Sequence, residues 1–495
     1  MAAKISLLFV LCSVLFVSAD SAGDCRDIFE SEQCWKNTLD KFRPKDGSQL
    51  DSPSFRYFKA APNMPRVLIY GDSISIGYTQ YVQDMLAGKA IVQRIPTNGD
   101  DTFHGAEYLE LCGMEKGRWD VIHFNWGLHD LKRLSKTDDG RVVPDKEKAA
   151  PANSIEAYSA NLEKLIKLMK SSGAELVFAA TTPAGGNAAS MLDSDVRAYN
   201  EAAFAVMEKH GVRVNNLYSV IKPNLSSYQG GDGVHFKPQG SLALAAEVGW
   251  SILSVLDMAD CSDIYSSRLC WTRALNAHKI HIDAPAYRYV ETRPDLPRVL
   301  IYGDSISIGY TKYVQDLLEG KVIVQRIPTN GGATAGGYDK LKYAGLEQGK
   351  WDLIHFNWGL HDLKYLYKQP GGRTVLDAER GSQVSSVNEY ADNLDKLVEV
   401  LKTSGAKLVF ASTTPVGPGN AGRKIGDAAR YNQAASQVMK KHGVSINDLY
   451  GLVKPRLSEY QLPNNVHYNE DGSRAMARQV AECIVKELEI GITKK

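Results

Sequence analysis

The chain has 495 residues, of which 44% are hydrophobic and 23% charged, as is usual for globular proteins. Its 58 basic and 57 acidic residues are interspersed and give a formal net charge of +1, which excludes the electrostatic attraction on which generic nucleic-acid binding depends. This composition also excludes disordered, collagen-like and coiled-coil proteins.

The N-terminus has the pattern of a secretory signal peptide. Lys4 supplies a positive charge, an apolar run of thirteen residues extends from Ile5 to Val17, and small residues follow at a cleavage site. Thirteen residues are too few to span a bilayer comfortably, and no later run reaches about eighteen. We therefore expect residues 1–19 to be removed and the mature protein to be secreted, extracellular and without a membrane span. A short N-terminal anchor is the alternative.

Each half of the chain opens with a pair of cysteines nine residues apart. In an oxidising compartment we expect both pairs to form local disulfides, Cys25–Cys34 and Cys261–Cys270. Cys12 leaves with the expected signal peptide, and the six remaining cysteines of so long a chain would act as staples on domains that already have a core. Cys112 and Cys483 have no counterpart in the other half, so they either pair with each other or stay free.

An internal repeat defines the organisation of the chain. Residues 66–99 recur at 298–331 with four changes in 34 positions, and residues 117–132 recur at 349–364 with two changes in sixteen. The offset of 232 residues persists to the end of the repeat, which is therefore a whole domain and not a solenoid unit. We predict two similar domains, over residues 20–257 and 258–495.

Short apolar runs alternate with segments of helical spacing inside each copy. In the first copy the pattern predicts strands over residues 67–70, 91–95, 121–124, 176–180 and 212–216, and helices over 75–87, 155–171, 194–209 and 238–255. Strands separated by helices form right-handed βαβ units, so we expect a parallel sheet covered by helices on both faces. Ligands of such sheets bind beyond the carboxyl ends of the strands.

Ser73 stands at the first of these strand ends, in the sequence Gly71-Asp72-Ser73. A serine at a strand-to-helix turn faces solvent, and its backbone N–H at the helix N-terminus can stabilise a developing oxyanion. The alternative is a serine that only caps the helix. We expect Asp72 to hold the turn through hydrogen bonds to the backbone.

Asp232 and His235 lie in a glycine-rich loop near the other end of the copy. Their spacing of three lets the carboxylate orient the imidazole, which can then accept a proton from a serine; a capped loop with a solvated histidine is the alternative. Of the other histidines that recur at the 232-residue offset, His123 lies in a strand and His210 at a helix end, and both are interpreted as structural. His129 remains a candidate.

Together these motifs resemble the GDSL-type, or SGNH, serine hydrolases, in two tandem copies. Gly71-Asp72-Ser73 matches the family's nucleophile block, Gly99 its oxyanion glycine, and Asp232 with His235 its final D-x-x-H block. The resemblance covers nearly all of each copy, from about residues 66 and 298 onward. It implies a flavodoxin-like three-layer α/β/α fold with a central parallel sheet, and ester hydrolysis through an acyl-enzyme without a metal or cofactor.

The third block departs from the family pattern. The family has an oxyanion-donating asparagine in G-x-N-D, where this chain has His129 and His361. A neutral imidazole can donate one N–H, and the nearby asparagines are the other candidates. Losing one oxyanion donor costs about 10²–10³ in rate, so the departure threatens rate more than reaction type. The expected oxyanion donors are Gly99, Asn125 and His129, and in the second copy Gly331, Asn357 and His361.

The two copies also differ in the expected triad. Asp232 aligns with Asn464, and in a serine-protease triad the exchange of aspartate for asparagine lowers turnover by about 10⁴. We therefore predict that Ser73, Asp232 and His235 carry most of the activity. Ser305 and His467 are expected to form a weakened site, or one that only binds.

Further candidates lie on the same predicted rim. Thr182 and Thr414 follow a predicted strand, and they either line a substrate pocket or only terminate the strand. Trp126 and Trp358 either stack on a sugar or pack in the core. Asn224 begins an N-glycosylation sequon. The spacing of His123 and His129 matches no strong zinc pattern, so we expect no metal.

The sequence thus predicts a secreted serine esterase that hydrolyses small acyl esters, mainly in the first domain. Its expected partner is a small ester or an acylated carbohydrate, with O-acetyl groups on carbohydrate preferred on the family resemblance and the rim tryptophans. Nucleic acid is not an expected partner, and the oligomeric state is left open. The alternative is a non-catalytic extracellular matrix or glycan-binding protein that keeps the hydrolase fold, which Asn464 and the altered third block favour.

Overall fold

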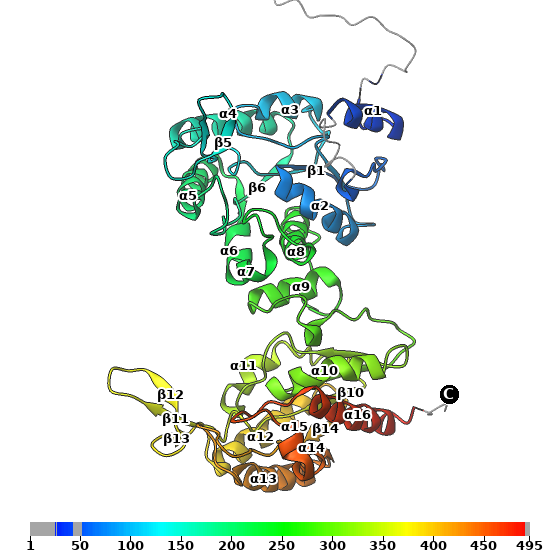
Figure 1. The fold of residues 1–495 in the computed structure, drawn as a ribbon. Helices are drawn as coiled ribbons and strands as arrows, with labels where there is room; N and C mark the ends of the chain where they lie inside the picture. The colour runs from blue at the N-terminus through cyan, green and yellow to red at the C-terminus, as the bar shows by residue number, and fades with distance from the viewer. Residues whose placement is uncertain (1–24, 26, 43–51, 491–495) are drawn as a thin grey trace, which may run out of the picture.

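The structure is a computed structural model that describes residue 25 and residues 27–42 and 52–490. The expected signal peptide, residues 1–19, lies outside the described residues. Figure 1 shows two α/β bodies that follow one another along the chain. Within the described ranges, none of the helices combines the length and the apolar character needed to cross a bilayer.

Each body is built on a five-stranded sheet whose neighbouring strands all run parallel. The strand order is β2-β1-β3-β6-β7 in the first sheet and β9-β8-β10-β14-β15 in the second. The first sheet consists of β1 (Arg66–Tyr70), β2 (Ile91–Arg94), β3 (Val121–Phe124), β6 (Glu175–Ala179) and β7 (Arg213–Asn215). The second consists of β8 (Arg298–Tyr302), β9 (Ile323–Arg326), β10 (Leu353–Phe356), β14 (Lys407–Ala411) and β15 (Ser445–Asn447).

Helices flank both sheets, which confirms the predicted tandem three-layer SGNH-like fold (Figure 1). The helices of the first body are α1 (Glu32–Phe42), α2 (Ser73–Met85), α3 (Gly105–Leu111), α4 (Ile155–Ser171), α5 (Asp193–His210), α6 (Leu217–Ile221), α7 (Leu225–Tyr228) and α8 (Pro238–Val255). Those that follow are α9 (Arg268–Ala277), α10 (Ser305–Leu317), α11 (Gly337–Leu341), α12 (Val387–Lys402), α13 (Asp427–His442), α14 (Leu449–Val453), α15 (Leu457–Tyr460) and α16 (Glu470–Glu487). Single 3₁₀ turns are η1 (Pro53–Phe55), η2 (Lys222–Asn224), η3 (Pro285–Tyr287), η4 (Thr334–Gly336) and η5 (Lys454–Arg456).

The core arises from the apolar runs of the sequence. The central strands β1, β3, β8 and β10 are buried almost throughout, because helices cover both faces of a parallel sheet. Helix α2 packs against α8 and helix α4 against α5, and the second copy repeats both pairs. Local signals fix the helix ends, as at α12, where Ser386 and Glu389 form a capping box.

Two antiparallel elements were not predicted from the sequence. A hairpin of β4 (Leu134–Lys136) and β5 (Val142–Pro144) follows β3, and a three-stranded sheet of β11 (Tyr365–Lys368), β12 (Thr374–Leu376) and β13 (Ser382–Gln383) follows β10. In Figure 1 the yellow β11–β12 hairpin projects from the second body. These strands are short and largely exposed, so they carry little of the hydrophobic pattern on which prediction depends.

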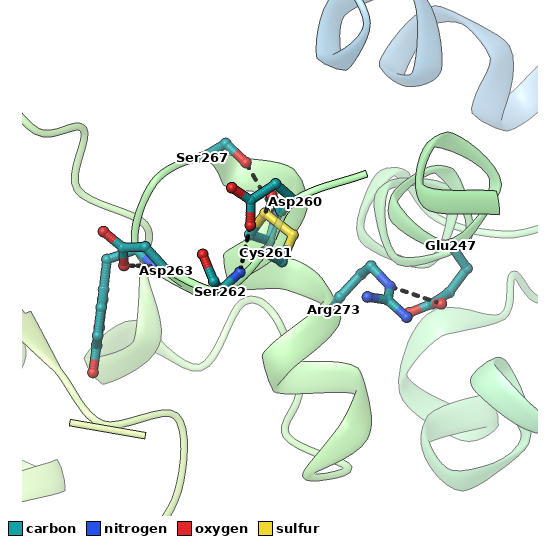
Figure 2. The surroundings of a disulfide bond; sticks show 9 residues. Glu247, Asp260, Cys261, Ser262, Asp263, Ser267 and Arg273 are labelled. Atoms are coloured by element: carbon teal, nitrogen blue, oxygen red, sulfur yellow. Dashed lines mark hydrogen bonds and ion pairs between the residues drawn. A yellow bond between two sulfur atoms is a disulfide. The ribbon is translucent and has the colours of Figure 1, made fainter. Parts of the chain in front are cut away.

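Disulfide bonds join Cys25 to Cys34 and Cys261 to Cys270, the two pairings that the sequence predicts. Cys112 and Cys483 are free thiols, so the alternative in which they stay unpaired is the one found. Figure 2 shows the bridge at Cys261 beside α9. On the same helix, Arg273 Nε lies 3.3 Å from Glu247 Oε2 of α8, which links the second copy's opening segment to the first body.

Candidate active site

The turn after the first strand presents Ser73. Strand β1 ends at Tyr70, and Asp72 is the N-cap of α2, where its side chain accepts a hydrogen bond from Ile74 N–H at 2.9 Å. The aspartate therefore holds the turn as expected, and Ser73 is the first helical residue and not the cap. Ser73 is partly exposed, so its hydroxyl is accessible. Asp304 and Ser305 repeat this turn in the second copy.

The structure brings Ser73 and the distant loop of Asp232 and His235 together. Ser73 Oγ lies 2.8 Å from His235 Nε2, and His235 Nδ1 lies 2.5 Å from Asp232 Oδ2. The second oxygen of Asp232 accepts the N–H groups of Val234 and His235 at 3.0 Å each. Because a carboxylate only accepts, Nδ1 carries the hydrogen and Nε2 is free to accept the serine proton. This is the geometry of a serine, its base and the residue that orients the base.

Burial pushes the pKa of Asp232 upward, but the hydrogen bonds from the His235 side chain and from the two N–H groups outweigh it. The net pKa of this carboxyl is therefore below its usual value, and the group is a carboxylate at neutral pH. The side chains of Asp232 and His235 are 50% and 51% exposed, so solvent screens the charge between them.

In the second copy Ser305 Oγ lies 2.8 Å from His467 Nε2, but the expected partner of the histidine is wrong. Asn465, and not Asn464, contacts the imidazole, with 2.7 Å between Oδ1 and Nδ1. The loop makes its left-handed turn one residue earlier, at Asn464 (φ 55°) where the first copy turns at Gly233 (φ 73°). This places the next side chain against the imidazole, and Asn465 Oδ1 also accepts the N–H groups of Val466 and His467.

The expected oxyanion glycines have their N–H groups engaged elsewhere. Gly99 N–H donates to the carbonyl of Gly71 at 3.0 Å, and Gly331 N–H donates to that of Gly303 at 2.9 Å. The reason is a close approach of two loops, because a Cβ on Gly99 would lie 2.8 Å from the same carbonyl oxygen. In this structure the two glycines therefore join the loop after the second strand to the nucleophile turn, and the expectation of free donors is corrected.

The expected asparagine donors are also engaged in structural bonds. Asn125 Nδ2 donates to the carbonyl of Ala179 at 2.7 Å, and Asn357 Nδ2 donates to that of Ala411 at 2.7 Å. Both side chains are buried and tie the end of the third strand to its neighbour. The expectation that they face an oxyanion is therefore corrected. The candidate donors that remain are the N–H of Ser73, at the start of α2, and the third-block histidine.

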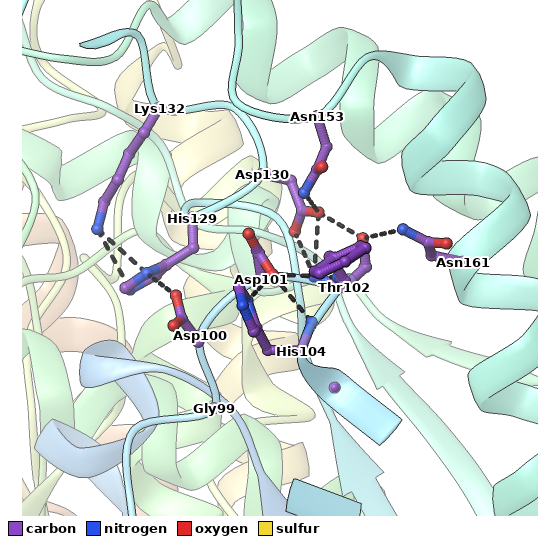
Figure 3. Close-up of polar contacts among 12 residues, drawn as sticks. Gly99, Asp100, Asp101, Thr102, His104, His129, Asp130, Lys132, Asn153 and Asn161 are labelled. Atoms are coloured by element: carbon purple, nitrogen blue, oxygen red, sulfur yellow. Dashed lines mark hydrogen bonds and ion pairs between the residues drawn. The ribbon is translucent and has the colours of Figure 1, made fainter. Parts of the chain in front are cut away.

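Figure 3 shows how the third-block histidine is held in the first copy. His129 Nδ1 lies 2.9 Å from Asp100 Oδ1, and Lys132 Nζ lies 3.1 Å from the same nitrogen. The hydrogen bond from His129 is the main reason why the pKa of Asp100 lies below its usual value. With its Nδ1 hydrogen on a carboxylate, the ring can donate through Nε2 only when it is protonated.

In the second copy the same histidine has a different environment. Gly332 replaces Asp100, and the group nearest to His361 Nδ1 is Lys364 Nζ, at 3.5 Å. Burial lowers the pKa of His361 to about 4, and the nearby positive charges of Lys364, Arg423 and Lys340 add to the effect. His361 is therefore a neutral imidazole at pH 7.

The aspartate of the third block has a structural role that the sequence did not single out. Asp130 is buried and accepts hydrogen bonds from Thr102 N–H, Thr102 Oγ1 and Asn153 Nδ2 at 3.1, 2.5 and 2.8 Å (Figure 3). Burial raises its pKa to about 6 against these hydrogen bonds. Asp362 repeats the arrangement with Thr334 and Ser385. Its signals in the sequence were its place at the end of the third block and its recurrence in both copies.

The tryptophans of the third block do not face a ligand. Trp126 and Trp358 have no exposed surface, and Trp126 packs against Tyr70 and Phe124 with ring centroids 4.4 and 5.7 Å away. The side chain also lies over Gly105, where a Cβ would come within 2.8 Å of the indole. Of the two interpretations, packing is correct and sugar stacking is wrong.

The threonines of the rim are buried as well. Thr182 is 3% exposed and lines a small cavity of about 10 Å³ together with Asp72 and Ser75 of the nucleophile turn. Thr414 and Asp304 line the same cavity in the second copy. Such a volume accommodates one water at most, so the interpretation of these threonines as substrate contacts is corrected.

The remaining recurrent histidines are structural, as the sequence indicates. His123 and His355 are fully buried, which lowers their pKa to about 3 and about 4, and each lies near an asparagine of the last strand. Elsewhere, Asp395, Glu399 and His442 on α12 and α13 have ligand-type atoms within 4.8 Å of one another, but Lys441 already pairs with Asp395 at 2.7 Å. Asn224 is partly exposed at the end of η2, and its glycosylation stays a prediction.

Comparison with known proteins was made on sequence and on fold. The model of the GDSL-like lipase/acylhydrolase family matches the chain twice, at residues 69–243 and 301–475. No curated protein matches the chain. Similar solved structures include a lipase/acylhydrolase from Enterococcus faecalis (20% identity, TM-score 0.32, covering 39% of this chain and 96% of that one) and an acetyl xylan esterase, AlAXEase (16%, 0.30, 38% and 99%). A putative arylesterase from Agrobacterium tumefaciens is another (18%, 0.30, 39% and 99%).

Proposed function

Because this chain belongs to the GDSL-like lipase/acylhydrolase family, we propose that it is a secreted serine esterase that hydrolyses small acyl esters, with Ser73 as its principal nucleophile. One observation carries the proposal, the continuous contact from Ser73 Oγ through His235 to Asp232 at 2.8 and 2.5 Å. Two disulfides support an oxidising, extracellular location. With Trp126 and Trp358 buried, the proposal does not extend to a carbohydrate substrate.

In the proposed reaction Ser73 Oγ attacks the acyl carbon while its proton passes to His235 Nε2. Asp232 stabilises the imidazolium that forms, through its contact with Nδ1. The N–H of Ser73 and the imidazole of His129 are the candidate donors to the oxyanion. His235 returns its proton to the leaving alcohol, and a water activated by the same histidine then releases the acid from the acyl-enzyme. This sequence uses only groups of the chain and water.

We propose that the second copy is the weaker catalyst. Asn465 Oδ1 accepts the Nδ1 hydrogen and so keeps the same tautomer of His467 that a carboxylate would select. An amide has no charge, however, and cannot stabilise the imidazolium in the same way. Ser305 Oγ and His467 Nε2 are 2.8 Å apart, the same distance as between Ser73 and His235 in the first copy. The proposed difference between the copies is therefore one of reaction rate.

The test is labelling of the mature protein with a fluorophosphonate, followed by mapping of the modified serine by mass spectrometry. We expect labelling at Ser73 that is lost in the Ser73→Ala variant and much slower labelling at Ser305. The Ser305→Ala variant is the matched control and should keep most hydrolysis of a generic acetyl ester. Equal losses in the two variants would disprove the asymmetry, and absence of labelling at both serines between pH 6 and 9 would favour a non-catalytic binding protein.

A further inference from the structure

The two copies differ in charge around the third-block histidine. Four positions within its electrostatic environment make the second copy more positive, whereas a fifth, His104, corresponds to Gly336 and removes an imidazole. Asp100 and Asp101 correspond to Gly332 and Ala333, Tyr108 corresponds to Lys340, and Met191 corresponds to Arg423. One lysine is common to both copies, as Lys132 and Lys364. Charge-changing positions that gather at one place of near-identical copies favour different ligands.

In the first copy the charges around His129 are paired. Asp100 contacts His129 at 2.9 Å, with Lys132 beside them, and Asp101 contacts His104 at 2.8 Å (Figure 3). The hydrogen bond with Asp101 raises the pKa of His104. This part of the first site therefore holds two carboxylates beside Lys132 and offers little attraction to an anion.

In the second copy three cationic side chains surround His361 and bind only uncharged groups. Lys340 Nζ donates to the carbonyl of Asn330 at 2.8 Å, Arg423 Nε donates to the carbonyl of Leu360 at 2.8 Å, and Lys364 Nζ lies 3.5 Å from His361 Nδ1. Lys340 Nζ also lies 2.5 Å from the position of a Cβ on Gly332, so it occupies the space above the glycine that replaces Asp100.

Among the described residues, carboxylates act on these cations only from beyond ion-pair distance, since Asp362 and Asp304 raise the pKa of Lys364 and Arg423 without pairing with them. In the described part of the chain, Lys340, Lys364 and Arg423 form no ion pair with an acidic side chain. The nearby acids are Asp304 and Asp362, which are buried, accept hydrogen bonds from their own loops and have pKa values above the usual range because of burial. All three cations are only partly exposed. Partly desolvated charges without counterions are costly, which favours a role in binding.

Mutual repulsion supports the same conclusion. Burial lowers the pKa of Lys340 and of Lys364, and the positive charge of a neighbouring cation lowers each further. Burial also lowers the pKa of Arg423. A bound anion would offset the repulsion between the cations, because an opposite charge nearby raises the pKa of a lysine or arginine. Charge-assisted hydrogen bonds from lysine and arginine to a carboxylate or sulfonate oxygen are among the strongest available to a protein.

We propose that the second copy is an anion-selective site, in which Lys340, Lys364 and Arg423 bind a carboxylate or sulfonate-like group of an ester whose acyl carbon lies at Ser305. The first copy, with Asp100 and Asp101 in the same region, selects neutral esters. The binding part of this inference is independent of catalysis, and its hydrolytic part rests on the proposed function. The chain would then hold two related sites with complementary substrate preferences.

The binding test uses the full-length mature protein with Ser73→Ala and Ser305→Ala, titrated calorimetrically with benzenesulfonate and with neutral benzenesulfonamide. We expect one sulfonate site per chain, with at least about tenfold tighter binding than the sulfonamide and an affinity that falls as salt rises. Lys340→Tyr and Arg423→Met introduce the first copy's own residues, and each should weaken sulfonate binding by about three- to tenfold. Arg423→Lys keeps the charge and should retain most of the affinity.

Lys321→Gln is the matched control, because it removes an exposed positive charge just before β9, at the opposite edge of the sheet. It should change sulfonate binding by less than about twofold. Equal affinity for the two probes, or equal effects of Lys321→Gln and Arg423→Met, would overturn the inference. Circular dichroism and thermal melting verify that each variant is folded.

The hydrolytic test separates this inference from the proposed function. The ratio of kcat/KM for 4-acetoxybenzenesulfonate to that for 4-acetoxybenzenesulfonamide is measured in Ser73→Ala, where only the second site acts, and in Ser305→Ala, where only the first acts. We expect the ratio to be at least about tenfold higher for the second site. Hydrolysis without this difference would overturn anion selectivity and leave the esterase proposal intact. Selective sulfonate binding without hydrolysis at either site would overturn the esterase proposal and leave anion-selective binding intact.

Discussion

Replacing Asp232 with asparagine removes the negative charge from the proposed triad of the first copy, together with one of the two oxygens that accept hydrogen bonds. In the structure Asp232 Oδ2 lies 2.5 Å from His235 Nδ1, and Oδ1 accepts two backbone N–H groups at 3.0 Å. The second copy contains this amide already, because Asn465 Oδ1 holds His467 Nδ1 at 2.7 Å. The variant therefore measures what the charge and the second acceptor oxygen contribute together, whereas in the second copy a single amide oxygen accepts from both the backbone and Nδ1.

The size of the effect follows from the distance between charges and from exposure. Two unit charges about 4 Å apart attract by about 1 kcal/mol in water and about 4 kcal/mol at an effective dielectric constant of about 20. Both side chains are about half exposed, so the interaction lies between these values. Since about 1.4 kcal/mol corresponds to a factor of ten, we expect kcat to fall by about 10- to 10³-fold, which is less than in a buried protease triad.

The assay is the kcat of the Asp232→Asn variant on a generic acetyl ester, with Ser305→Ala present so that only the first site contributes. Asp139→Asn, an exposed carboxylate on the β4–β5 hairpin, is the control and should not change kcat. The reciprocal variant, Asn465→Asp with Ser73→Ala, should raise kcat at the second site by a similar factor. A decrease of less than threefold in the first variant, together with no gain in the second, would refute the assigned role of the carboxylate.

Three further predictions concern stability. Burial raises the pKa of Asp130 to about 6 in the folded state, whereas the unfolded carboxyl ionises at about pH 4, so the folded state loses stability as pH rises from about 4 to about 6. In urea unfolding, the stability of the wild type relative to Asp130→Asn should fall by roughly 3 kcal/mol over this window. A rise would contradict the assignment. Trp126→Ala should lower the free energy of unfolding by about 3–5 kcal/mol, because the side chain is fully buried; a change confined to substrate specificity would show that it faces a ligand. Replacing Cys261 and Cys270 together by serine should cost about 2–3 kcal/mol, measured by thermal melting against the intact chain, and an unchanged Tm would show that the short loop contributes no constraint.

Much of the fold could be predicted because its signals are local. Runs such as Val67–Tyr70 are long enough and apolar enough to define buried strands, and the repeat at an offset of 232 residues fixes the tandem arrangement. The β4–β5 hairpin and the sheet of β11, β12 and β13 escaped prediction because short, exposed strands are stabilised by pairing across a turn and carry little pattern of their own.

The site could be predicted in part. The spacing of Asp232 and His235 indicated a carboxylate on an imidazole, and the structure places both beside Ser73. The partner of His467 could not be predicted by alignment, because a left-handed residue moves by one position and brings Asn465 to the ring. The burial of Trp126 could not be predicted either, because a residue just after a strand can face either solvent or a helix.

The sequence by itself determined that the chain holds two parallel α/β units, each with a serine at its first turn and a histidine some 160 residues later, because these features depend on periodicity, repetition and short motifs. Only the tertiary structure decided which N–H groups are already engaged, which amide meets His467 and which charges collect around His361. Those properties depend on where separate loops approach one another at the edge of the sheet. Contacts between loops are set by packing of the whole domain, and no local stretch of sequence encodes them.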